Sequence, residues 1–281
     1  METAAKTISL NTIDISYTDS GQGNNPLILI HGFPFDKTMW QQQIDFLQSS
    51  TRVISYDIRG FGKSTTDGTP FSIELFTYDL INFMNALEIS KATICGLSMG
   101  GYICLHAMKQ FPEHFDGMIL CDTQCIADSA ETKKKRFKSI EQIEKNGTVD
   151  FTEAFLKSVF YENSFITKKN TVENARKMIL STAPESLIGG LRALAERAET
   201  CSSLEAISVP VLIICGHEDQ IIPINKCEYM YLHIKNASTK VIESAGHVSN
   251  LEQPDVFNNY VFDFLYDMHE NAEHEKLKVM Q

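Results

Sequence analysis

Short apolar runs alternate along the chain with segments of helical periodicity. From Ile8 to Tyr17 apolar and polar residues alternate singly, which predicts a half-buried hairpin at a sheet edge. Continuous apolar runs, typical of strands buried on both faces, follow at 26–30, 53–56, 92–95, 118–121 and 209–215, with a weaker one at 240–242. Helical patterns separate them at 39–47, 73–87, 102–111, 223–234 and 254–264. This alternation predicts an α/β fold, with a mostly parallel sheet covered by helices on both faces.

One long stretch interrupts this alternation. From about residue 124 to residue 205 the patterns are all helical, with many charges and no strand candidate. Because strand and helix alternate again afterwards, we expect a helical cap inserted into one α/β domain. The predicted organisation is a core with a first part at 1–123, a cap at 124–205, a second part of the core at 206–268 and a polar tail at 269–281. We expect the tail to fray.

Composition narrows the class of protein. The chain has 281 residues, of which 43% are hydrophobic and 22% charged, as in an ordinary globular protein. Its formal net charge of −11 argues against a nucleic-acid partner, because phosphate binding needs a clustered positive field. There is neither a signal-peptide pattern nor an apolar run of the roughly 18 residues that span a bilayer. We therefore expect a cytoplasmic protein without a membrane partner; no pattern indicates an oligomeric state.

The chain contains seven cysteines. Most lie inside apolar runs, no CxxC pair occurs, and the spacing does not suggest a disulfide framework. We therefore predict buried free thiols that pack as small hydrophobic side chains.

A candidate nucleophile lies in Gly96-Leu-Ser98-Met-Gly100, between the strand at 92–95 and an amphipathic helix. A G-x-S-x-G sequence between a strand and a helix is typical of a nucleophile elbow. Glycine is needed at 96 and 100 because the turn is tight, and the helix N-terminus favours an oxyanion. The alternative is an ordinary glycine-rich turn with a serine N-cap.

A serine nucleophile needs a base, and the base needs an orienting carboxylate. Among eight histidines the best candidate for the base is His247, in a loop of small residues just after the last predicted strand. For the acid we favour Asp219, in the loop after the strand at 209–215. Asp122, which ends the strand at 118–121, and Glu218 stay as alternatives.

Several motifs together resemble those of the α/β-hydrolase superfamily, in order, from about residue 8 to residue 266. They are His31-Gly-Phe-Pro-Phe-Asp36, Tyr56-Asp-Ile-Arg-Gly-Phe-Gly-Lys-Ser64, Gly96-Leu-Ser-Met-Gly-Gly101, Gly216-His-Glu-Asp219 and Gly246-His247. Within the superfamily the segments 31–40 and 120–123 are similar to those of 3-oxoadipate enol-lactonase-like esterases. These enzymes share motifs with carboxylesterases and cofactor-free haloperoxidases.

The resemblance implies a specific architecture and site. It implies eight strands, the second antiparallel, with a helical cap after the sixth. It implies that three residues, Asp57, Arg59 and Ser64, hold a loop and do no chemistry. Two backbone N–H groups, of Phe33 and Met99, are the expected oxyanion donors, and we expect His31 to pack beneath their turn.

The expected activity is hydrolysis of a small to medium carboxylic ester or lactone through an acyl-enzyme, without a metal or organic cofactor. Serine at position 98 disfavours haloalkane dehalogenases and epoxide hydrolases of this fold, which carry aspartate there. Alternatives with the same triad are C–C bond hydrolysis of a diketone, thioester hydrolysis and perhydrolysis; an alternative of another class is a low-turnover receptor or scaffold. Aromatic residues of the cap are candidates for the pocket lining or for its core: Phe137, Phe155, Phe160 and Tyr161.

Overall fold

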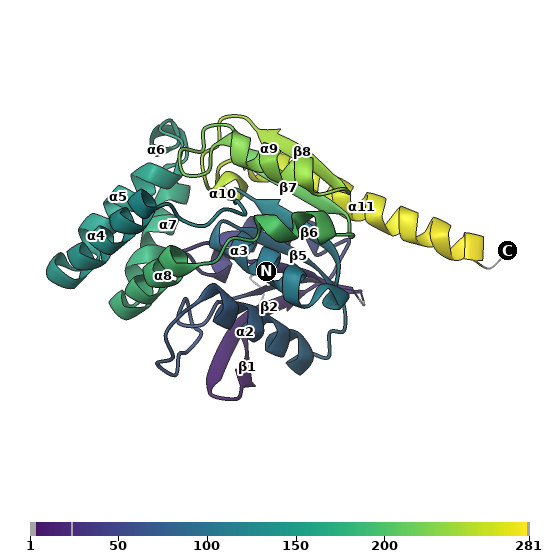
Figure 1. Ribbon diagram of the computed structural model, residues 1–281, viewed down its shortest axis with the longest axis horizontal. Coiled ribbons are helices and arrows are strands. Elements are labelled where there is room, and N and C mark those ends of the chain that lie inside the picture. Colours follow the sequence, from purple (N-terminus) through teal and green to yellow (C-terminus); the bar gives the residue numbers. More distant parts are fainter. Residues whose placement is uncertain (1–3, 24, 280–281) are drawn as a thin grey trace.

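The computed structural model describes residues 4–23 and 25–279 and contains one eight-stranded sheet (Figure 1). The strands are β1 (Lys6–Leu10), β2 (Ile13–Ser20), β3 (Leu27–Ile30), β4 (Val53–Tyr56), β5 (Ala92–Leu97), β6 (Phe115–Cys121), β7 (Val211–Gly216) and β8 (Ala237–Ile242). Their order in the sheet is β1-β2-β4-β3-β5-β6-β7-β8. Only β2 runs antiparallel to its neighbours, β1 and β4, and all other pairs are parallel. The predicted fold class is therefore confirmed.

Helices connect these strands at the predicted places. Outside residues 124–205 they are the short η1 (Lys37–Trp40), α1 (Gln41–Leu47), α2 (Ile73–Ala86), α3 (Met99–Gln110), the short η2 (Pro112–His114), α9 (Ile224–His233), α10 (Ser249–Glu252) and α11 (Pro254–Val279). The last helix extends far beyond its predicted end at 264, because no glycine or proline follows Pro254 to stop it. Most of the tail that we expected to fray is therefore helical. No helix in the described part of the chain is long and apolar enough to cross a membrane.

The hydrophobic core lies on the parallel strands. Every residue of β3, β4, β5 and β7 is buried, which explains why their sequences are continuous apolar runs. Helix α1 packs against α11, and α2 packs against α3. The ring of Trp40, the last residue of η1, lies 6.0 Å from the ring of Phe257 in α11, and both side chains are fully buried. Apolar contacts thus position the carboxyl ends of the strands, where the candidate residues lie.

The loop after β4 is held by buried charges. The carboxylate of Asp57 accepts hydrogen bonds from the backbone N–H of Lys37 at 2.8 Å and from its Nζ at 2.6 Å. Arg59 forms a two-pronged ion pair with Asp79, both distances 2.7 Å. Ser64 Oγ donates to the carbonyl oxygen of Asp57. These contacts confirm that the loop is held by the three residues that the resemblance assigned to it.

Between β6 and β7 the described chain forms helices and no strands. We call residues 124–205 the helical insert. It contains α4 (Ala130–Asn146), α5 (Val149–Val159), α6 (Ser164–Thr167), α7 (Lys169–Ser181), α8 (Pro184–Glu196) and the short η3 (Cys201–Ala206), whose last residue lies just past the insert. Helix α4 packs on α8 and α5 packs on α7. Figure 1 shows α4, α5, α7 and α8 gathered at one side of the sheet.

The prediction of free thiols is wrong for four of the cysteines. Cys125 is bonded to Cys201, and Cys215 to Cys227. The first disulfide joins the two ends of the helical insert, where the N–H of Thr200 also donates to the carbonyl oxygen of Cys125 at 2.8 Å. The sequence could not reveal this pairing, because the partners are 76 positions apart and meet only after the insert has folded. The three other cysteines are free and buried, as expected: Cys95, Cys104 and Cys121.

We predict that the disulfide at the ends of the insert stabilises the fold. It closes a loop of 76 residues, for which the chain-entropy relation gives about 4 kcal/mol. The double variant Cys125→Ala/Cys201→Ala should lose about this free energy of unfolding in urea titrations. Reductant should destabilise the wild type more than this variant, because only Cys215–Cys227 is left for it to break. An equal response to reductant in both proteins would contradict the prediction.

Candidate active site

The turn that carries Ser98 requires glycine on both sides. Ser98 lies between β5 and α3 with backbone angles φ 53° and ψ −109°, a region that non-glycine residues rarely occupy. A Cβ atom at Gly96 would collide with the backbone of Gly100, and a Cβ atom at Gly100 would collide with the backbone of Ile30. The strand and the helix therefore approach closely only because both flanking residues lack a side chain. The serine side chain is left half-buried at the N-terminus of a 12-residue helix.

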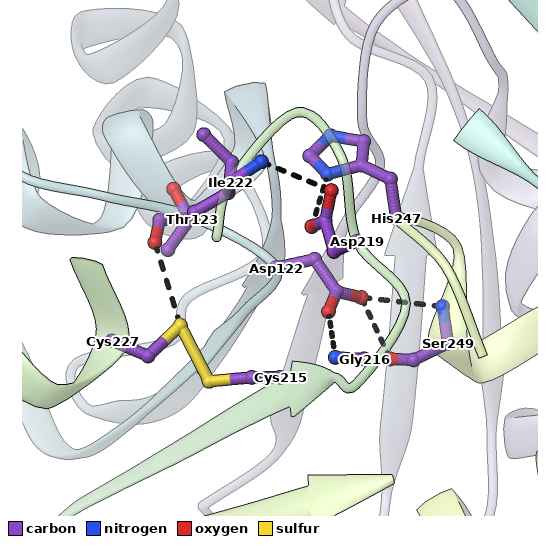
Figure 2. The surroundings of a disulfide bond; sticks show 9 residues. All are labelled: Asp122, Thr123, Cys215, Gly216, Asp219, Ile222, Cys227, His247 and Ser249. Atoms are coloured by element: carbon purple, nitrogen blue, oxygen red, sulfur yellow. Dashed lines mark hydrogen bonds and ion pairs between the residues drawn. A yellow bond between two sulfur atoms is a disulfide. The ribbon is translucent and has the colours of Figure 1, made fainter. Parts of the chain in front are cut away.

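A chain of two hydrogen bonds links Ser98 to Asp219 through His247. Ser98 Oγ lies 2.7 Å from His247 Nε2, and His247 Nδ1 lies 2.7 Å from Asp219 Oδ2. Because an ionised carboxylate can only accept, Nδ1 carries the proton and Nε2 accepts from the serine hydroxyl. The other carboxylate oxygen, Asp219 Oδ1, accepts from the backbone N–H groups of Ile221 and Ile222. Figure 2 shows the Asp219 carboxylate facing the imidazole ring.

The electrostatic surroundings of His247 favour its protonated form. The ring is almost completely buried, and this desolvation by itself lowers the pKa of His247. The charge of Asp219 and its hydrogen bond act in the opposite direction and prevail, so the pKa of His247 lies above its ordinary value of 6.5. The histidine is therefore well suited to receive the serine proton and to hold it.

Asp122, the alternative acid, forms no hydrogen bond with His247. Its Oδ1 accepts from the N–H of Gly216 at 2.8 Å, and its Oδ2 accepts from Ser249 Oγ at 2.6 Å and from the N–H of the same serine at 3.2 Å (Figure 2). Complete burial, with the nearby charge of Asp219, raises the pKa of Asp122 to about 7. Asp122 thus ties the start of the loop that carries Asp219 to the segment just after His247.

The turn at His31-Gly32-Phe33 lies directly against the nucleophile. A Cβ atom at Gly32 would lie 3.4 Å from Cβ of Ser98. The backbone N–H groups of Phe33 and Met99 have no hydrogen-bond partner among the described residues. Two free donors beside one serine are what an oxyanion hole requires.

The other candidate residues have structural surroundings. His31 is fully buried, and its Nε2 accepts from the N–H of Ile58 at 2.9 Å, so it packs beneath the turn as expected. Glu218, the third candidate for the acid, is partly exposed and lies 3.1 Å from Nδ1 of His217. The structure therefore brings neither residue into the chain of hydrogen bonds.

Aromatic side chains of the helical insert extend toward the same turn. The ring of Phe155 lies 6.0 Å from that of Phe33, and the ring of Phe151 lies 6.3 Å from it. Of the other predicted lining residues, Phe137 is 42% exposed, and Phe160 is buried. The insert thus places apolar surface beside the Ser98 turn through Phe151 and Phe155.

One buried carboxylate beside the histidine loop was not among the residues predicted from the sequence. Glu252 is fully buried, and it accepts hydrogen bonds from the backbone N–H groups of Gly246 and Tyr161. Only its position five residues after His247, directly after Leu251, could have drawn attention to it.

The fold and this arrangement define the class of protein. A model of the alpha/beta hydrolase fold family matches residues 25–254, which is most of the chain. The protein therefore belongs to the alpha/beta hydrolase fold family.

Within this family the chain is similar to enol-lactonases and esterases. The chain is 30% identical over 256 residues to 3-oxoadipate enol-lactonase 2 of Acinetobacter baylyi, covering 91% of this chain and 94% of that one. A solved thermophilic esterase from Thermogutta terrifontis superposes with a TM-score of 0.89 at 32% identity, covering 95% of this chain and 99% of the esterase. The enol-lactonase of Burkholderia xenovorans superposes with a TM-score of 0.87 at 26% identity, covering 93% of this chain and all of that one. The predicted resemblance to enol-lactonase-like esterases is thus confirmed.

We predict that Ser98 becomes less reactive as the pH decreases, because His247 must be neutral to accept the proton of the serine hydroxyl. Since the pKa of His247 is raised, the rate of labelling by a fluorophosphonate should fall as pH decreases through a midpoint above 6.5. The variant Asp219→Asn loses the negative charge that raises the pKa of His247, so the midpoint should move to lower pH. A midpoint at or below 6.5 in the wild type, or one unchanged in the variant, would contradict this assignment. Mass spectrometry of the adduct gives the rate.

Replacing the two candidate acids, Asp219 and Asp122, should lower the labelling rate of Ser98 by very different factors. Asp219→Asn should lower the labelling rate by about 10⁴-fold, because the histidine loses the partner that orients Nδ1. Asp122→Asn removes a carboxylate that forms no hydrogen bond with the ring, so the labelling rate should fall far less, by about 10-fold at most. Measuring both variants at the same pH decides between the two acids; the reverse order would make Asp122 the acid.

Proposed function

We propose that the protein is a serine hydrolase that cleaves a small to medium carboxylic ester or lactone through an acyl-enzyme. The observation that carries the proposal is the continuous chain of hydrogen bonds from Ser98 through His247 to Asp219. The similarity to an enol-lactonase and to a solved esterase supports the same reaction class.

In the proposed first half of the reaction, Ser98 Oγ attacks the carbonyl carbon while its proton passes to His247 Nε2. Asp219 stabilises the imidazolium that forms. The carbonyl oxygen becomes an oxyanion and accepts from the N–H groups of Phe33 and Met99; one such donor is worth about 3 kcal/mol of transition-state stabilisation. The carbon–oxygen bond to the leaving group then breaks as His247 gives its proton to the departing oxygen, which leaves an acyl group on Ser98.

In the second half, water replaces the alcohol. His247 removes a proton from the water while the water oxygen attacks the acyl carbon. The bond to Ser98 Oγ then breaks, and the proton on Nε2 returns to the serine. For a lactone the two product groups stay in one molecule. These steps call for no metal ion or organic cofactor.

We further propose that the helical insert serves as a cap over a core formed by residues 1–123 and 206–268. Phe155 and Phe151 meet the ring of Phe33, so the insert contributes apolar surface next to the proposed oxyanion hole. This surface favours substrates whose acyl group is apolar near the carbonyl.

We predict that Ser98→Ala abolishes hydrolysis of a short-chain p-nitrophenyl ester. The loss should be of order 10⁴-fold or more in kcat, because no other side chain replaces the nucleophile. Product release is followed by absorbance, and a fluorophosphonate adduct is mapped by mass spectrometry. Ser181→Ala, a serine exposed on α7, is the matched control and should keep the wild-type rate.

The other outcomes separate the alternatives. Labelling of Ser98 without ester turnover would indicate a competent nucleophile with another substrate, such as a thioester, a diketone or a peroxide with an acid. Full turnover in Ser98→Ala would contradict the proposal. Neither labelling nor turnover in the wild type would favour a receptor or scaffold.

A further inference from the structure

Glu252 is a buried carboxylate that the proposed reaction does not use. Its side chain is completely buried at the end of α10. No lysine, arginine or histidine in the described part of the chain lies within ion-pair distance of it. Burying an anion without a cation is costly unless hydrogen bonds satisfy it. Burial accordingly raises the pKa of Glu252, and hydrogen bonds partly offset the rise.

The hydrogen bonds of Glu252 connect two separate segments. Oε2 accepts from the backbone N–H of Gly246 at 2.6 Å, on the loop that carries His247. Oε1 accepts from the N–H of Tyr161 at 2.9 Å and from Ser164 Oγ at 2.5 Å, both in the helical insert. One carboxylate thus joins the insert to the histidine loop.

The two segments are also in direct backbone contact. The N–H of His247 donates to the carbonyl oxygen of Val159 at 2.8 Å. A Cβ atom at Gly246 would lie 2.7 Å from that oxygen and 2.8 Å from the nitrogen of Tyr161, so no side chain fits there. The backbone of the histidine is therefore built against the insert, and Glu252 closes the contact from behind.

We infer that Glu252 is a positioning residue, which holds His247 in line with Ser98 by clamping the histidine loop to the helical insert. This inference rests on the proposed role of His247 as the base. It follows that a shift of residues 159–164, for example when substrate enters beneath the insert, changes the geometry of the base. The insert would then act on the chemical step as well as on substrate binding.

Replacing Glu252 by glutamine tests the clamp directly. A carboxylate accepts hydrogen bonds at both oxygens, whereas a glutamine of the same size accepts at one and donates at the other. In Glu252→Gln the NH₂ group must face either the backbone N–H of Gly246 or that of Tyr161, and neither N–H can accept a hydrogen bond from it. The substitution therefore breaks the backbone clamp on one side without creating a cavity.

The experiment compares three variants with the wild type. Glu252→Gln breaks the clamp, and Ser164→Ala removes one hydrogen bond from its insert side. Thr152→Val is the matched control, because it removes a buried hydroxyl of the insert that bonds only within α5 and its N-cap. We measure the rate of fluorophosphonate labelling of Ser98, kcat and KM for the short ester, and the downfield NMR resonance of the His247 Nδ1 proton.

Glu252→Gln should lower the labelling rate and kcat by about 10- to 100-fold, the loss expected for a misplacement near 1 Å. KM should change little, and the downfield resonance should shift or broaden. Ser164→Ala should act in the same direction with a smaller fall, and the losses of the two variants should not add. Thr152→Val should match the wild type.

Wild-type labelling, kcat and resonance in Glu252→Gln would overturn the inference. If Glu252→Gln does not fold, Ser164→Ala decides, and equality of this variant with Thr152→Val would overturn it. If the wild type shows neither labelling nor turnover, the proposed function is contradicted instead. The histidine resonance then still reports whether Glu252 positions the ring.

Discussion

The backbone conformation of Ser98 is the constraint on which the rest of the site depends. With φ at 53°, the residue is held in a region that costs of order 1–3 kcal/mol. The surrounding structure imposes it, because β5 is paired in parallel with β3 on one side and with β6 on the other. The close approach of Gly96 and Gly100 then leaves no other path for the chain. As a consequence the hydroxyl lies at a helix N-terminus, within reach of His247 and beside the turn of Phe33.

Three buried carboxylates surround one histidine, and each is satisfied differently. Asp219 accepts a hydrogen bond from the ring itself. Asp122 accepts from the backbone N–H groups of Gly216 and Ser249. Glu252 accepts from the backbone of the histidine loop at Gly246 and also bonds the helical insert. Only the first can orient Nδ1, because a hydrogen bond needs direct contact. The other two act through the backbone, and their negative charge requires the donors that they collect. The histidine loop is therefore held from several directions at once.

Two features hold the helical insert in place. The disulfide between Cys125 and Cys201 joins its two ends to each other, next to where the chain leaves and re-enters the core. Near its middle, residues 159–164 touch the histidine loop through Val159 and the carboxylate of Glu252. The segment that brings Phe155 to the Ser98 turn thus also supports the loop of His247. In the proposed mechanism, substrate binding beneath the insert and proton transfer by His247 are therefore coupled.

The sequence by itself determined the strands, most of the helices, and Ser98 and His247 of the hydrogen-bond chain. These features depend on local patterns: apolar runs, glycine spacing around Ser98, and loops that follow strands at the same edge of a parallel sheet. The end of α11 was missed because the residues after 270 are mostly polar and give no apolar pattern. Only the tertiary structure decided that Asp219 and not Asp122 touches His247, that Cys125 meets Cys201, and that Glu252 joins two segments. Such contacts form between residues far apart in the chain, and their geometry is set by packing that no local pattern encodes.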